Sequence, residues 1–156
     1  MTRLYPLLLC LALAGQAQAD DLMDNADLAA GNDLGDPVII RLLPPGSGQL
    51  AVIEQQGSGN RAAVDQNGQA LLGRIVQEGG AQEAYILQAG SDLMANISQQ
   101  GYGNSASIRQ SGSGNSASIE QVGNHNSASI EQAGTGLSSS VTQAGNGQHV
   151  QITQYR

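Results

Sequence analysis

Residues 103–134 read GNSASIRQSGSGNSASIEQVGNHNSASIEQAG, in which the pentapeptide NSASI occurs three times at a spacing of eleven residues. Glutamine keeps this spacing well beyond the quoted stretch. Ile or Val stands two residues before each glutamine, and Gly stands two residues after each of the first nine. A pattern this regular over about 100 residues indicates a repeat architecture. The ten glutamines are Gln55, Gln66, Gln77, Gln88, Gln99, Gln110, Gln121, Gln132, Gln143 and Gln154.

An eleven-residue period is also compatible with a long, regularly packed helix. The composition of the unit argues against helix, because a Gly in every unit and a surplus of Ser and Asn both oppose it. The unit instead alternates as x-A-x-I-x-Q and ends in a Gly-rich corner such as Ser111–Gly114. This alternation predicts a short strand with Ala, Ile and Gln on one face, followed by a turn.

A second period appears six residues before each glutamine. Alternate units carry only amides there, namely Asn60, Gln82, Asn104, Asn126 and Gln148, whereas the others carry Gln49, Leu71, Leu93, Asn115 and Leu137. The structural repeat is therefore 22 residues long. We predict that residues 49–156 form an all-β fold, a β-solenoid of five strand-turn-strand rungs with two facing parallel sheets. At ~4.8 Å per rung, it would be about 24 Å tall.

The interior of such a solenoid would hold columns of Ala, Ile and Gln. A buried Gln is normally costly, but in a stack each amide can donate to the amide above and accept from the one below. We therefore interpret the ten glutamines as a ladder that another chain could extend, giving cross-β amyloid on assembly. The predicted set of templating residues also includes Asn60, Asn104, Asn115, Asn126, Ile108, Ile119, Ile130 and Ile152.

The outward positions predict two further features. Leu50, Leu72 and Met94 would form an apolar column, which is either incidental surface or a partner contact, and Val52 and Val76 would lie beside it. Arg109 and Glu131 would lie on successive rungs as a surface ion pair worth less than ~1 kcal/mol.

The first 48 residues differ in character from the repeats. Residues 1–19 have a basic start at Arg3, an apolar core and an Ala17–Ala19 cleavage motif, which predicts a secretory signal peptide. Its apolar run is far shorter than the ~20 residues that span a bilayer. Cys10, the single cysteine, lies inside it, so the exported chain would have no disulfide. Residues 20–48 are acidic and then rich in Pro and Gly, which predicts a flexible leader.

The residues offer little catalytic or ligand-binding chemistry. The formal net charge is −7, and no basic stripe exists to neutralise phosphates, which argues against a nucleic-acid partner. His125 and His149 have no second His or Cys at metal-ligand spacing. No Ser accompanies a convincing His and acid pair. We expect no enzymatic activity, no metal and no cofactor.

The ends of the predicted solenoid would have unpaired N–H and C=O groups, which soluble solenoids protect with caps. Only Tyr155 and Arg156 follow the last glutamine, so we expect an open end. An open end invites another chain to add a strand. The expected function is polymerisation, or its initiation.

Units such as Gln110-x4-Asn115-x5-Gln121, with Ala and Ile between, resemble the curlin repeat of bacterial curli fibres. The likeness covers about residues 49–156. Ala84–Gly90 and Ile152–Arg156 are more similar to the minor subunit, the nucleator, than to the major fibre subunit. Gln82 stands where the family usually has Asn.

The resemblance implies an extracellular amyloid fimbria on the outer-membrane surface of a Gram-negative bacterium, serving adhesion and biofilm formation. It implies three kinds of partner: the major curlin subunit, further copies of this chain, and the secretion channel and accessory factors of the outer membrane. Two alternatives stay open. One is the main fibre subunit, and the other is a monomeric solenoid that acts as an adhesin or binding module.

Overall fold

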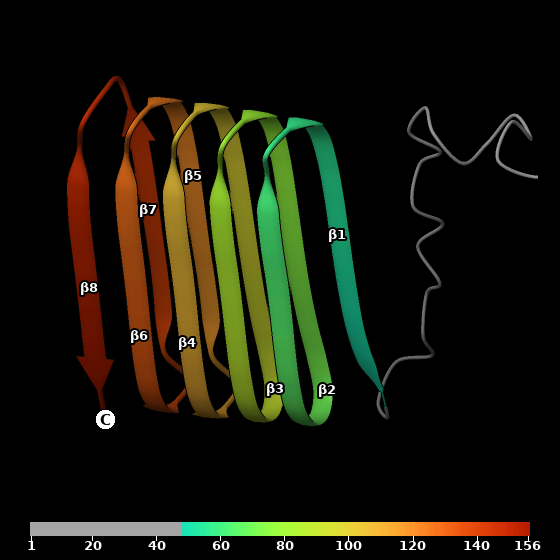
Figure 1. Cartoon of the computed structure of the whole chain (residues 1–156). Helices are drawn as coiled ribbons and strands as arrows, with labels where there is room; N and C mark the ends of the chain where they lie inside the picture. Colours follow the sequence, from blue (N-terminus) through green and yellow to red (C-terminus); the bar gives the residue numbers. More distant parts are fainter. Residues whose placement is uncertain (1–47) are drawn as a thin grey trace, which may run out of the picture. The chain divides into compact units, whose positions relative to one another are not determined.

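The computed structural model describes residues 48–156, so the signal peptide predicted at 1–19 and nearly all of the leader predicted at 20–48 lie outside the described residues. The described part is all-β (Figure 1). Within it, no helix is long and apolar enough to cross a membrane. The strands are β1 (Gln49–Ser58), β2 (Arg61–Gly80), β3 (Glu83–Tyr102), β4 (Ser105–Ser113), β5 (Ser116–Asn124), β6 (Ser127–Thr135), β7 (Ser138–Ala144) and β8 (His149–Tyr155).

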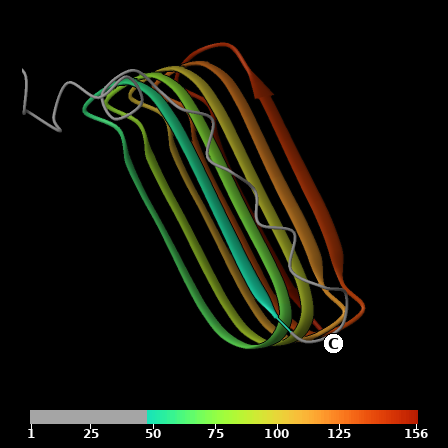
Figure 2. The same ribbon diagram turned by 90° about the vertical axis from the view of Figure 1, so that its right-hand side faces the viewer.

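All strand pairs are parallel, and each residue pairs with the one 22 positions later, as Gln55 does with Gln77 and Gln66 with Gln88. β2 and β3 each continue through a corner, so the first length of each strand lies in one layer and its second length lies in the other (Figure 2). One layer contains β1, the second lengths of β2 and β3, then β5 and β7; the other contains their first lengths, then β4, β6 and β8. The predicted β-solenoid of five 22-residue rungs is confirmed.

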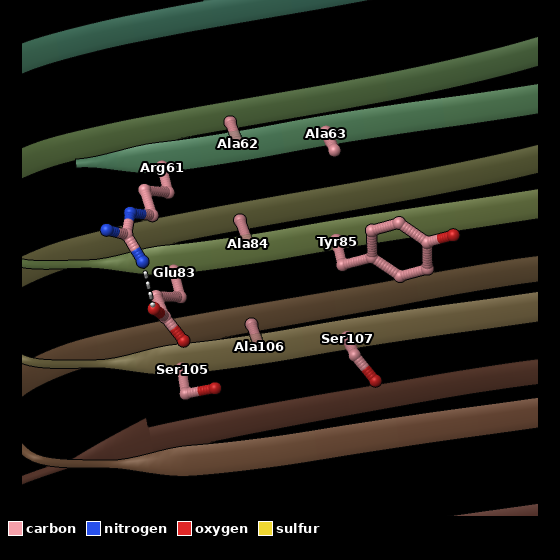
Figure 3. Close-up of a pocket in the computed structure, with 9 residues that line it drawn as sticks. All are labelled: Arg61, Ala62, Ala63, Glu83, Ala84, Tyr85, Ser105, Ala106 and Ser107. Atoms are coloured by element: carbon pink, nitrogen blue, oxygen red, sulfur yellow. Dashed lines mark ion pairs between the residues drawn. The ribbon is translucent and has the colours of Figure 1, made fainter.

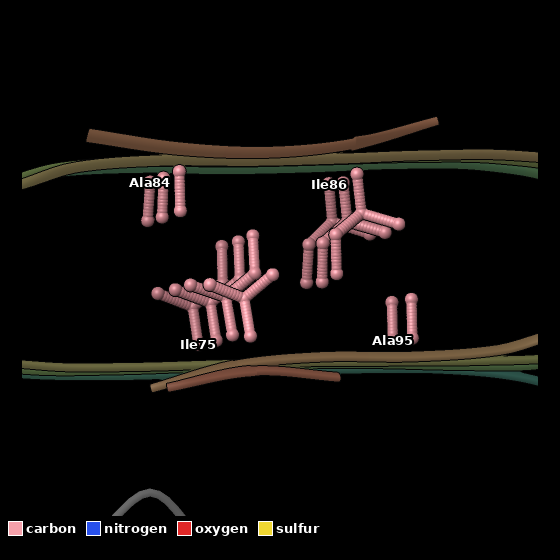
Figure 4. Close-up of a cluster of buried hydrophobic side chains, with 12 residues drawn as sticks. Ile75, Ala84, Ile86 and Ala95 are labelled. Atoms are coloured by element: carbon pink, nitrogen blue, oxygen red, sulfur yellow. The ribbon is translucent and has the colours of Figure 1, made fainter. Parts of the chain in front are cut away.

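The core is built from columns of identical side chains. Ile75, Ile86 and Ile97 are fully buried, and so are their equivalents on later rungs. Figure 4 shows that the Ile column of one layer lies opposite the Ala column of the other, so a large side chain meets a small one across the interior. This pairing keeps the core close-packed, and it explains why the repeat needs both an Ala and an Ile at fixed places.

Each corner uses two residues with positive φ. The Gly two residues after each of the first nine glutamines has a φ between 106° and 144°, and a Cβ on Gly57 would lie 1.8 Å from the carbonyl oxygen of Gly79. The second position, seven residues before each of the last nine glutamines, has a φ between 52° and 70°. It is Gly at five corners, but Ala70, Ala81, Asp92 and His125 occupy it at the other four. These four side chains adopt a left-handed conformation that L-residues rarely favour.

The predicted ion pair between Arg109 and Glu131 is wrong. The two residues are in register on β4 and β6, but within residues 48–156 the ion pairs join Arg61 to Glu83 at 3.6 Å and Arg74 to Glu54 at 3.5 Å. An exposed pair gains too little to hold two long side chains in one geometry, so alignment alone does not produce a contact.

The outward apolar column is present but smaller than predicted. Leu50, Leu72 and Met94 lie in register, and Leu72 and Met94 are exposed. Val52 adds nothing to this surface, because only 3% of it is exposed. Its register partner is Arg74, whose guanidinium lies 3.5 Å from the carboxylate of Glu54.

Candidate assembly interface

Two continuous ladders of glutamine amides run the length of the solenoid. In one layer the Nε2 of Gln55 donates to the Oε1 of Gln77 at 2.6 Å, and the ladder continues through Gln99 and Gln121 to Gln143 at 2.7–2.9 Å. In the other layer the ladder joins Gln66, Gln88, Gln110, Gln132 and Gln154 at 2.8–3.1 Å. The seven glutamines from position 77 to position 143 are at most 1% exposed.

The second N–H of each ladder amide crosses to the facing layer. The Nε2 of Gln99 donates to the carbonyl of Glu83, and the Nε2 of Gln110 donates to that of Met94, both at 3.0 Å and sixteen residues earlier in the chain. This bond fixes the orientation of the amide, because Nε2 must face the carbonyl. The ladder is therefore polar: every amide donates toward the C-terminal end and accepts from the N-terminal side. All its buried hydrogen-bonding groups inside the stack are satisfied, which removes the usual cost of a core Gln.

The predicted asparagines hold the corners together. The Nδ2 of Asn104 donates to the carbonyls of Gln100 and Gly123 at 3.2 and 2.8 Å. Its Oδ1 accepts the backbone N–H of Asn126 on the next rung at 3.0 Å. Asn60, Asn115 and Asn126 make equivalent bonds across their own corners. A side-chain amide here supplies donors and an acceptor that the turning backbone needs.

Gln82 fills the same corner position imperfectly. Its Nε2 reproduces the asparagine bonds, donating to Glu78 and Gly101 at 3.0 Å each. Its Oε1, set one methylene further out, is the one buried side-chain polar atom in the described part of the chain that has no hydrogen-bond partner. The sequence showed that Gln replaces Asn here but not that the acceptor would be lost.

The isoleucines predicted for the interface differ in burial along the solenoid. Ile108, Ile119 and Ile130 are fully buried, whereas Ile152, on the last strand, is only half-buried. Ile53 and Val64 on the first rung are half-buried as well. The interior columns therefore reach the solvent at both ends of the described solenoid.

The end strands also have open hydrogen-bonding edges. Within residues 48–156, β1 pairs only with β2, β7 only with β5, and β8 only with β6. Outward-facing residues donate their N–H forward to the next rung, as Ser116 does to Leu137 and Ser127 to Gln148. Inward-facing residues donate backward, as Gly145 does to Val122. Because of this alternation, the outward-facing residues of β7 and β8 direct their backbone N–H groups away from β5 and β6, along the solenoid axis at the C-terminal edge.

The outer surface of residues 48–156 has a pocket and two histidines, which are the places to look for ligand-binding chemistry. A shallow pocket lies over the first lengths of β2 and β3 and over β4, between Arg61 and Glu83 on one side and Tyr85 and Ser107 on the other (Figure 3). The ion pair occupies its polar side, and no nucleophile-base pair lines it. Among residues 48–156, no three His, Cys, Asp or Glu side chains are grouped to hold a metal ion.

This geometry defines a class of protein: a parallel β-solenoid whose amide ladders run unbroken from the first to the last of the described rungs. The curlin associated repeat family matches the chain at residues 68–101, 101–134 and 123–155. These segments cover more than half of the chain, and the chain belongs to that family. No curated protein and no solved structure gave a significant match. Family membership identifies a structural, curli-type subunit of self-assembling extracellular fibres.

Proposed function

We propose that this chain is the minor curli subunit, which nucleates polymerisation of the major curlin into extracellular amyloid fibres. One observation carries the proposal: the interior columns of the last rung match those of the first. Val141 stands in the column of Ile53, and Gln143 in the column of Gln55, at the same spacing as every internal pair. A chain whose end repeats its own interior can extend that interior into another chain with the same repeat.

The physical advantage of a preformed end lies in conformational entropy. A soluble curlin chain must fix a whole rung of backbone before any ladder bond forms, at about 1–2 kcal/mol per residue. An end that already holds Gln143, Gln154 and their neighbours in register offers ladder partners for each residue as it is fixed. The slow first step is thereby replaced by strand addition.

The assignment to the minor subunit is tested in cells. Deletion of the gene should leave the major curlin secreted but unpolymerised, and soluble curlin in the medium would be measured by immunoblotting. If this chain is instead the main fibre subunit, cells lacking any other curlin will still make abundant fibres from it. A concentration-independent monomer that does not bind amyloid dyes would favour the monomeric binding module.

Export and surface retention form part of the same proposal. Residues 1–19 would direct secretion, residues 20–48 would form the leader, and the outer-membrane channel with its accessory factors would deliver the repeats for adhesion and biofilm formation. The apolar column of Leu50, Leu72 and Met94 would contact the partner that retains the fibre at the cell.

Surface retention has a matched test, because Ser116 and Ser138 already occupy this column on later rungs. The double substitution Leu72→Ser with Met94→Ser should release fibres into the medium without preventing assembly. Val122→Ser, at an exposed apolar side chain outside the column, serves as the control. Retention of the doubly substituted fibres would remove the column from the proposal.

A further inference from the structure

The two ends of the solenoid differ, and we infer that the edge formed by β7 and β8 is the one that receives the next chain. Its occupant would be the first rung of a curlin-repeat chain, in the simplest case a second copy of this one. The inference rests on the proposed function and assigns the direction in which further chains are added. Charge and corner regularity distinguish this edge from the N-terminal one, and amide polarity and glycine geometry show how an incoming rung fits it.

Charge separates the two edges. The first rung has Glu54 on β1 and Arg61 and Asp65 on β2, all facing outward along strands that pair on one side only within residues 48–156. β7 (Ser138–Ala144) and β8 (His149–Tyr155) hold no carboxylate, lysine or arginine. Charged side chains on an edge strand oppose addition of a further strand, and natural sheets use them for that purpose. The strands of the C-terminal edge lack this protection; the charged side chain beside them is that of Arg156, which directly follows β8.

Amide polarity determines how an incoming rung pairs with the C-terminal edge. The Nε2 of Gln143 donates to the carbonyl of Ser127, and the Nε2 of Gln154 donates to that of Ser138. On every earlier rung the other N–H of this nitrogen serves the next amide of the ladder. The C-terminal edge therefore offers two oriented donors. In an incoming copy, the Oε1 atoms of Gln55 and Gln66 are the matching acceptors.

Glycine geometry leaves one corner of this edge open for a further rung, at Gly145, whereas at the other corner Arg156 lies over Gly134. A Cβ on Gly123 would lie 1.9 Å from the carbonyl oxygen of Gly145, so each glycine of this column lies directly beneath the next. A Cβ on Gly145 would meet only the Nε2 of Gln148, at 3.4 Å. Gly145 therefore presents a flat backbone on which Gly57 of an incoming chain can lie in the same way.

The rungs that support β7 and β8 are more regular than the N-terminal rungs, and this regularity preorganises the C-terminal edge. Three of the four non-glycine left-handed corners, at Ala70, Ala81 and Asp92, lie toward the N-terminal end, as does the unpartnered acceptor of Gln82. The rungs under β7 and β8 repeat the NSASI unit with its amides fully bonded. A template that holds its edge in one conformation binds the incoming strand at a lower entropic cost.

A pair of proline variants tests the direction. Thr142→Pro removes a donor that points off the C-terminal edge, and Ala51→Pro removes one that points off the N-terminal edge, because inward residues donate backward. Neither breaks a bond between described rungs, and edge strands tolerate proline at such positions. Each folded variant is immobilised, and capture of the labelled unmodified chain is followed. Capture should fall about tenfold for Thr142→Pro, because the variant loses one hydrogen bond to the incoming chain and its ring hinders the approach of that chain. Capture should stay unchanged for Ala51→Pro.

A second pair does not depend on proline. Thr142→Glu with Thr153→Glu would place carboxylates opposite Glu54 and Asp65 of an incoming copy, and capture should fall at low salt and recover at high salt. Gln56→Glu with Asn67→Glu adds the same charge to exposed positions of the first rung and should leave capture unchanged.

The ratio of capture between C-terminal and N-terminal edge variants decides the inference. Equal capture by the two members of a pair, or selective loss in the N-terminal variants, would overturn the inference. Failure of the proposed function would appear separately, as an inability of the unmodified immobilised chain to capture the major curlin. Protease resistance of each variant, compared with the unmodified chain, confirms that the immobilised solenoid is folded.

Discussion

The N-terminal rungs (residues 49–92) and the C-terminal rungs (residues 93–156) share one interior but differ at their corners. Both place Ile and Gln in unbroken columns with the same 22-residue register. The N-terminal rungs also contain both ion pairs, three strained corners and the unpartnered acceptor of Gln82. The interior columns therefore determine the fold, whereas the corners determine how many of the polar groups of each rung find a hydrogen-bond partner.

The largest effect is expected at the glycine columns. Gly112→Ala would place a Cβ 1.9 Å from the carbonyl oxygen of Gly134, and Gly79→Ala would make the same clash at 2.0 Å in the N-terminal rungs. Both should lower the free energy of unfolding by about 3 kcal/mol or more, as severe overpacking does. Urea denaturation measures the loss. Gly145→Ala is the control, because it has the same φ strain without the clash. Similar losses in all three variants would show that the stacked carbonyl is not the constraint.

The second largest effect on stability is expected at the glutamine ladders. Gln121→Ala removes the acceptor of Gln99 and the donor to Gln143, and Gln77→Ala does the same in the N-terminal rungs. Each should cost about 1–3 kcal/mol of unfolding free energy and slow assembly, because buried amides lose partners. Denaturation and dye-binding kinetics check both effects. Equal costs support a uniform ladder, whereas normal stability in either variant would contradict burial of the amide column.

A stabilising change is expected at the imperfect corner. Gln82→Asn should recover the acceptor that Asn60 and Asn126 provide on other rungs, and so bond the N–H of Asn104. The gain should be about 1 kcal/mol in unfolding free energy. Gln148→Asn, at an exposed residue of the same column, should change stability little. Stabilisation by the control alone would indicate that the unpartnered oxygen carries no cost.

The smallest effect concerns the left-handed corners. Ala81→Gly and Ala70→Gly should each stabilise the chain by about 0.5–1 kcal/mol, because Gly adopts positive φ without the Cβ penalty. Gly114→Ala, at the equivalent corner of the C-terminal rungs, should destabilise by a similar amount. Unfolding midpoints compare the three variants. Unchanged unfolding midpoints for all three variants would show that corner strain does not distinguish the N-terminal from the C-terminal rungs.

The sequence predicts the interior well because the period of eleven fixes which residues face inward. Strand register and the burial of Gln99 or Ile108 follow from that period. It does not predict the conformation of Ala81 or His125, because neither residue type signals a left-handed corner. It also does not predict the polarity of the ladder. That polarity depends on the carbonyl sixteen residues earlier, which reaches the amide only once the facing layer is in place.

The central claim is that a preformed rung templates the next chain through its interior columns. The most direct test adds a small fraction of the folded chain to soluble major curlin and follows the lag before polymerisation by dye fluorescence. We expect the unmodified chain to abolish the lag and the Gln121→Ala variant to do so less effectively. A lag that is the same with and without the unmodified chain would contradict this claim.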